Sequence, residues 1–166
     1  MHDQFTSAVR YFLTWNLERI LRCLDELSEE QLWQRPNASS NSVGNQVLHL
    51  CGNLRQWVLS GVGGEPDDRR RDAEFAARGG HDRAALGAAL RRVIDDCVAV
   101  VDRTTEAELR PERPVQAYRH DGVFILLHAT EHLSYHTGQI IFQTKALLNV
   151  DLDFYGGDDL TATGGN

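Results

Sequence analysis

The chain of 166 residues contains little cysteine, little proline and a single lysine, Lys145, beside 16 arginines. Its three cysteines, Cys23, Cys51 and Cys97, are far apart and each lies among helix-patterned apolar residues. This dispersal excludes a secreted disulfide framework and predicts small buried thiols. Any covalent chemistry based on lysine has only one candidate residue.

Long apolar runs and excess positive charge are also missing. No apolar run approaches the ~20 residues that cross a bilayer. The first residues show neither a basic segment nor a continuous apolar one, so we expect a cytoplasmic protein with no membrane partner. The formal charge of −7, from 17 basic and 24 acidic residues, argues against a nucleic-acid partner, because phosphate binding needs a basic surface.

Helical periodicity, in contrast, runs through most of the chain. Four long segments carry apolar residues at spacings of three and four, and they are residues 5–27, 42–59, 83–104 and 122–148. Ser28 starts a short extra helix with a capping-box pattern, and Ser42 and Asp82 are the expected N-caps of the second and third long helices. Residues 65–80 between them are polar with mixed charges, which predicts a long solvated loop with about one helical turn.

The remaining segments favour a single bundle. Pro111 and Pro114 separate the last two long helices, and no segment shows strand-type alternation. The sequence therefore predicts an all-α, four-helix bundle over residues 1–150. Residues 151–166 form an acidic, glycine-rich C-terminal tail, whose last few residues we expect to be disordered.

Three of the seven histidines, His128, His132 and His136, fall within nine residues on the fourth long helix. At about 100° per residue they share one face, and neighbours at i, i+4 are within reach of one divalent metal ion. His128 and His136 are about 12 Å apart along the axis, so all three cannot bind the same ion. The helix supplies two ligands at most. The alternative is three packed histidines, each of which needs a buried hydrogen-bond partner.

His49 is the only other histidine in the middle of a long helix. It shares a polar stripe with Asn45, Gln46 and Asn53, opposite the apolar face of that helix. Periodicity leaves two interpretations open, since the stripe either faces solvent or forms the polar wall of a site.

Two established metal-site patterns fit this chain poorly. Residues 128–132 match the H-x-x-E-H order of inverted zinc proteases, but few residues remain for a downstream glutamate ligand. Glu131 is followed at i+3 by Ser134, so the Glu-x-x-His motif of ferritin-like di-iron sites is absent.

Two segments resemble a known family. VLHLCGNLRQW at residues 47–57 and EHLSYHTGQI at residues 131–140 are similar to the corresponding helices of DinB-like four-helix-bundle proteins. The similarity extends over about residues 3–148. In that family one histidine of the second helix and an H-x-x-x-H pair of the last helix bind a divalent metal, usually nickel or zinc. The resemblance implies His49, His132 and His136 as ligands, with one coordination position left open.

The resemblance also suggests roles for residues around these ligands. Those expected at the cavity wall or in contact with substrate are Asn45, Asn53, His128, Tyr135 and Gln139. Gln139 has an alternative role as a hydrogen-bond partner of a ligand. Arg55 either binds an acidic group of a thiol or substrate, or is an ordinary surface arginine.

The function implied by the resemblance is a metal-dependent transferase that uses a low-molecular-weight thiol on a small electrophilic substrate. A non-catalytic, stress-related metal-binding or sensing bundle is the first alternative, and a metal-dependent hydrolase is the second. The family also implies a homodimer, for which exposed-looking Trp15 and Trp33 are the only hint in the sequence.

Overall fold

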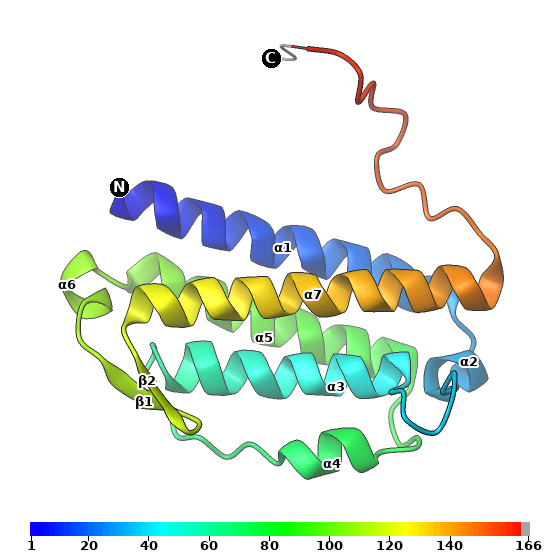
Figure 1. Cartoon of the computed structure of the whole chain (residues 1–166), viewed down its shortest axis with the longest axis horizontal. Helices are drawn as coiled ribbons and strands as arrows, with labels where there is room; N and C mark the ends of the chain where they lie inside the picture. Colours follow the sequence, from blue (N-terminus) through cyan, green and yellow to red (C-terminus); the bar gives the residue numbers. More distant parts are fainter. Residues whose placement is uncertain (164–166) are drawn as a thin grey trace.

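The computed structural model describes residues 1–163, and its frame is four long helices (Figure 1). They are α1 (His2–Glu26), α3 (Val43–Leu54) with its π-helical continuation η1 (Arg55–Ser60), α5 (Arg83–Arg103) and α7 (Gly122–Leu148). Helix α1 contacts α7 and α5, and α3 contacts α5 and α7, so neighbours follow the order α1–α7–α3–α5. The predicted all-α fold on four long helices is confirmed.

Local capping explains where these helices begin. Ser42 forms a capping box with Asn45 at the start of α3. Asp82 accepts a hydrogen bond from the Ala85 N–H at the start of α5. Asp121 accepts one from the Phe124 N–H at the start of α7. Each cap satisfies a backbone donor that has no partner inside the helix.

Apolar residues of all four helices fill the core, as their helical spacing predicts. Leu13, Ile20, Leu50, Leu90 and Ile94 are completely buried. The cysteines are free thiols, two of them buried and Cys51 partly so. Within residues 1–163, no helix combines the length and apolarity needed to cross a membrane.

The π-helical segment η1 is an irregularity of the long helices that bears on the site. The Gly61 N–H donates to the Gln56 carbonyl at 3.0 Å, one residue further back than in an α-helix. Such widened turns are rare in proteins, and those that occur are often at functional sites. Here the segment carries Trp57, which is only 3% exposed.

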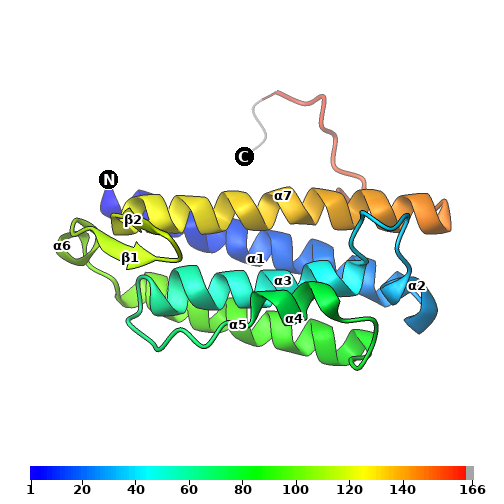
Figure 2. The ribbon, with the colours of Figure 1, turned by 60° about the horizontal axis from the view of Figure 1, so that its bottom comes forward.

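Three short helices and a hairpin join the long helices. The helices are α2 (Glu29–Trp33), α4 (Arg71–Ala76) and α6 (Glu106–Leu109). The capping box predicted at Ser28 is present at the start of α2. Helix α4 runs along α3, as Figures 1 and 2 both show. It is the helical turn expected within residues 65–80.

The all-α pattern has one exception within the described residues, a short hairpin over residues 113–120. Strands β1 (Arg113–Val115) and β2 (Tyr118–His120) form an antiparallel hairpin in which Val115 pairs with Tyr118. Each strand has three residues, too few to show a period of two, and Pro114 is tolerated because the ribbon has free edges. The hairpin lies across the end of the bundle near the start of α7 (Figure 2).

The tail is anchored at its beginning. Leu152 is buried, and Phe154 packs partly buried against the core. Residues 164–166, where disorder is expected, lie outside the described residues.

Candidate metal centre

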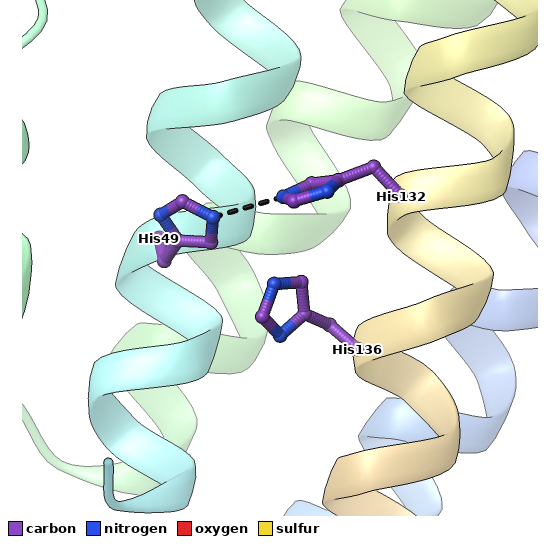
Figure 3. A group of neighbouring side chains, drawn as sticks. All are labelled: His49, His132 and His136. Carbon is purple, nitrogen blue, oxygen red and sulfur yellow. Dashed lines mark hydrogen bonds between the residues drawn. The ribbon is translucent and has the colours of Figure 1, made fainter. Parts of the chain in front are cut away.

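Three histidines converge in the seam between α3 and α7 (Figure 3). His49 comes from α3, while His132 and His136 come from successive turns of α7 and point toward it. One ligand nitrogen from each lies within 4.8 Å of the other two. Nε2 of His49 is 2.9 Å from Nε2 of His132. The group predicted as metal ligands is therefore brought together by the fold.

The donor chemistry of this group fits a divalent ion. An imidazole nitrogen binds zinc at about 2.0–2.1 Å, and the three ligand nitrogens lie within 4.8 Å of one another, close to the spacing of donors that share one ion. Burial, followed by the neighbouring imidazoles, lowers the pKa of His132 to about 3, and burial with His49 lowers that of His136 to about 4. Both rings are neutral at pH 7 and keep a lone pair for a metal. Three protein ligands leave a coordination position open.

Glu74 of α4 holds the His49 ring in place. Its Oε2 lies 3.0 Å from Nδ1 of His49, and both side chains are more than nine-tenths buried. Nη2 of Arg69 also lies 3.0 Å from this Nδ1, but it donates to Oε2 of Glu74 at 2.9 Å. Because a carboxylate only accepts hydrogen bonds, we assign the proton of His49 to Nδ1, which directs the lone pair of Nε2 toward the other histidines. A carboxylate behind a ligating histidine fixes its tautomer and orientation in this way.

Arg69 in turn orients Glu74. Its Nε and Nη2 donate to the two carboxylate oxygens at 2.8 and 2.9 Å, the paired geometry that arginine and carboxylate favour. Burial by itself raises the pKa of Glu74, but the hydrogen bonds from Arg69 and His49 outweigh it, and the pKa is lowered. Glu74 is therefore ionised at neutral pH.

The fit of α4 against α3 depends on a glycine and an asparagine. A Cβ at Gly52 of α3 would collide with Oε1 of Glu74, so the carboxylate can occupy this position only above glycine. Asn45 donates from Nδ2 to the carbonyls of Glu74 and Ala77, both at 2.9 Å. Its Oδ1 accepts from Arg35. Asn45 was expected at the cavity wall, but it does not line the cavity beside His132, and its amide anchors α4.

The other predicted site residues lie at different distances from the histidines. Asn53 and His128 line a cavity beside His132. Gln139 lies next to His136, where its side chain opposes the lowering of the pKa of that histidine. Tyr135 meets the His136 ring edge-on, with centroids 5.2 Å apart, but is 58% exposed. Arg55 is exposed and does not line the cavity, which favours the surface interpretation.

Sequence reasoning misses Arg69 and Glu74, because the mixed charges of residues 65–80 predict a solvated loop. The side chains of Arg69 and Glu74 are only 4% and 9% exposed. A metal-binding histidine commonly donates its other ring N–H to a carboxylate, so the sequence indicates only that an acidic residue is needed near His49. It does not single out one of 24 acidic residues. Gln46 was also missed as a neighbour of His136, at 3.4 Å from Nδ1.

The cavity next to His49 and His132 has a volume of about 340 Å³. Side chains of α3, η1 and α7 form its walls, and the β1–β2 hairpin covers one side. It gives a small molecule access to the histidine group.

Comparison with known proteins agrees with this architecture. The family model described as "Protein of unknown function (DUF1572)" matches residues 2–155. A DinB-like protein of Bacillus subtilis, YjoA, is similar in structure with a TM-score of 0.68 and 17% identity, over 89% of this chain and 97% of that one. A DinB-like protein of Bacillus cereus gives a TM-score of 0.65 and 18% identity, over 81% and 87%. No curated protein matches the sequence significantly. The DinB-like resemblance of the fold is confirmed.

Proposed function

The chain belongs to the DUF1572 family, whose fold is DinB-like, and on this premise we propose that it binds a divalent metal ion, nickel or zinc. The ligands are His49, His132 and His136. The observation that carries the proposal is the convergence of three ligand nitrogens within 4.8 Å, one of them on a ring held by Glu74.

An open coordination position would let a bound ion take part in catalysis. A divalent ion held by three neutral imidazoles retains its charge of +2 and stabilises a thiolate relative to a thiol. The proposed activity is the transfer of a low-molecular-weight thiol to a small electrophile. The chain supplies the imidazole ligands, a carboxylate that orients one of them, and a cavity beside them. Glu131, the carboxylate next to His132 in sequence, is exposed, which ranks hydrolysis below transfer.

A homodimer is the proposed assembly. Both α1 and α7 expose large apolar side chains, including Phe12 at 45%, Leu127 at 58% and Phe142 at 76%. The two tryptophans that hinted at a dimer contribute less than expected. Trp15 and Trp33 are both partly buried, and Trp33 covers Gly44 and donates to the His81 carbonyl. Light scattering of the full chain tests the assembly, and a monomer at micromolar concentration would contradict it.

Elemental analysis of untagged protein tests the metal. We expect about one nickel or zinc ion per chain, lost in His132→Ala and retained in the matched variant His81→Ala, whose histidine is exposed and outside the group. Equal metal content in wild type and His132→Ala would overturn the site.

A thiol-consumption assay then tests the activity. Metal-loaded wild type is expected to consume a low-molecular-weight thiol in the presence of an electrophile, whereas His132→Ala is not. Background rates with every such thiol would overturn the transferase and leave a non-catalytic metal-binding or stress-sensing bundle as the function.

A further inference from the structure

The two nitrogens of the His136 ring face different surroundings. Figure 3 shows one of them turned toward His49 and His132, and the other, next to the atom that joins the ring to its side chain, turned away. This second nitrogen, Nδ1, lies 3.4 Å from Oε1 of Gln46, at the long end of the hydrogen-bond range. A neutral imidazole has one protonated nitrogen, and only the other one can bind a metal ion. The position of the proton therefore decides whether His136 presents a lone pair to the histidine group.

A backbone carbonyl sets the direction of the hydrogen bonds that lead to this nitrogen. The Gln34 carbonyl can only accept, and it lies 3.2 Å from Nε2 of Gln143. The amide of Gln143 therefore turns its Oε1 to Gln46, whose Nε2 donates to it at 3.0 Å. The amide of Gln46 is fixed in turn, so its Oε1 faces His136. Because that oxygen can only accept, Nδ1 is the nitrogen that carries the proton.

Burial keeps the two amides in this orientation. Gln46 of α3 and Gln143 of α7 are only 5% and 7% exposed, and their hydrogen bond crosses the seam that holds the histidines. If Gln46 were reversed, its Oε1 would face Oε1 of Gln143. Two buried acceptors would then lack donors, which costs free energy that a buried site cannot recover from water.

Gln139 is a second candidate partner of His136. Its hydrogen bond opposes the lowering of the pKa of His136, as an acceptor would. However, Gln139 is only partly buried, and within residues 1–163 no hydrogen bond to a third residue fixes the direction of its amide. Only Gln46 belongs to a chain of hydrogen bonds that ends on a backbone carbonyl.

His132 provides a contrast within the same group. His49 carries its proton on Nδ1, beside Glu74, so its Nε2 can only accept. Nε2 of His132 lies 2.9 Å from that atom and is therefore the donor. The His132 proton thus faces the group, whereas the protons of His49 and His136 are held away from it.

We infer that Gln46 is the positioning residue of His136. Fixed by Gln143, it holds the His136 proton on Nδ1 and directs the lone pair of Nε2 toward the other two histidines. The use of that lone pair for a metal ion rests on the proposed function, whereas the tautomer does not. A carboxylate behind His49 and an amide behind His136 then prepare two of the three ligands.

Long-range proton–nitrogen correlation spectra of the full chain, metal-free at neutral pH and with isotope-labelled histidine, report the tautomers directly. The signals of His136 are those that disappear in His136→Gln. We expect His136 with its proton on Nδ1 and His132 with its proton on Nε2. Gln46→Met keeps the length of the side chain but has no amide, so the Nδ1–H form of His136 is expected to lose its dominance. A wild-type proton on Nε2 of His136, or an unchanged His136 in Gln46→Met, would overturn the inference.

Two variants of Gln143 separate hydrogen-bond direction from packing. Gln143→Glu keeps an acceptor for Gln46 in either protonation state, so the tautomer of His136 is expected to stay as in wild type. Gln143→Met has no such acceptor and leaves Gln46 free to turn, so a mixture of both tautomers is expected. Equal His136 spectra in these two variants would overturn the chain of hydrogen bonds. A larger change of tautomer in Gln139→Met than in Gln46→Met would assign the role to Gln139 instead and also overturn the inference.

Zinc affinity, measured by competition with a chelating dye, connects the tautomer with the proposed function. Gln46→Met is expected to weaken zinc about tenfold, and Gln143→Glu to retain the wild-type affinity. The matched control is Asn16→Leu, which removes a buried amide that donates to the Phe12 carbonyl of its own helix, α1. It is expected to change neither the tautomer nor the affinity. Wild-type zinc affinity in Gln46→Met would overturn the positioning role. The expected tautomers in a wild-type chain that binds no metal would support the inference and overturn the proposed function alone.

Discussion

Two seams of the bundle are built in opposite ways. The seam between α1 and α5 packs completely buried apolar residues such as Leu13 and Leu90, and ion pairs such as Arg10–Asp102 lie exposed at its rim. The seam between α3 and α7 is polar inside, where Nε2 of Gln46 donates to Oε1 of Gln143 at 3.0 Å and His49 meets His132.

This difference separates stability from function. An apolar seam gains free energy from burial without any requirement for hydrogen bonds. A polar seam stabilises the fold less and needs a partner for every buried group, so it persists where the polar groups have another use. We expect substitutions in the first seam to change unfolding, and those in the second to change ligand binding.

The largest expected effect is in the apolar seam. Leu90→Ala leaves a cavity in a completely buried position, which is expected to lower the free energy of unfolding by about 2–5 kcal/mol. Urea denaturation of metal-free protein measures the loss. Zinc affinity of the folded variant is expected to match that of wild type, and a parallel fall in affinity would show that the seams are not independent.

Metal itself is expected to give the next largest effect. Zinc or nickel at about 100 times its dissociation constant adds about 2.7 kcal/mol to the free energy of unfolding, because only the folded chain holds the three histidines together. Thermal unfolding with and without a chelator measures this gain. In His132→Ala the gain is expected to vanish while the metal-free transition changes little. A gain of equal size in that variant would place the ion elsewhere.

The carboxylate behind His49 is expected to have a smaller effect. Glu74→Gln keeps the shape of the side chain but weakens its hold on Nδ1, so zinc affinity is expected to fall about 10- to 100-fold. Competition with a chelating dye measures the affinity. Glu131→Gln is the matched control, because Glu131 is exposed beside His132 and, within residues 1–163, makes no hydrogen bond to the three histidines.

Gly52→Ala perturbs the Glu74 carboxylate sterically, from helix α3. Alanine in place of glycine stabilises a helix by about 1 kcal/mol, yet its methyl group would displace Glu74. We expect weaker zinc binding without loss of α3. Unchanged affinity in both Glu74→Gln and Gly52→Ala would show that α4 only covers the site.

Features of the fold that depend on residues close together in the sequence are predictable from it. The long helices and the caps at Ser42 and Asp82 arise from nearby residues, so periodicity and capping rules found them. The pairing of His132 with His136 is equally local. Periodicity left His49 undecided, and only the family resemblance assigned it.

The remaining features depend on contacts between distant segments. Glu74 meets His49 across 25 residues, and nothing near Glu74 distinguishes it from a solvated carboxylate. Asn45 was placed in the site because of its spacing from His49, but that spacing does not reveal α4 packed above it. The hairpin was missed because its pattern occupies too few residues.

The smallest expected effect concerns an ion pair at the rim of the apolar seam. Arg10 of α1 and Asp102 of α5 are 3.2 Å apart and both about half exposed, unlike the buried pair of Arg69 and Glu74. Arg10→Gln is expected to lower the free energy of unfolding by less than about 1 kcal/mol, because water and salt screen exposed charges. Urea denaturation at low and high salt measures this difference, which is expected to shrink as salt rises. A larger, salt-independent loss would mean that the apolar seam also relies on its polar rim, and the contrast between the seams would then be one of degree.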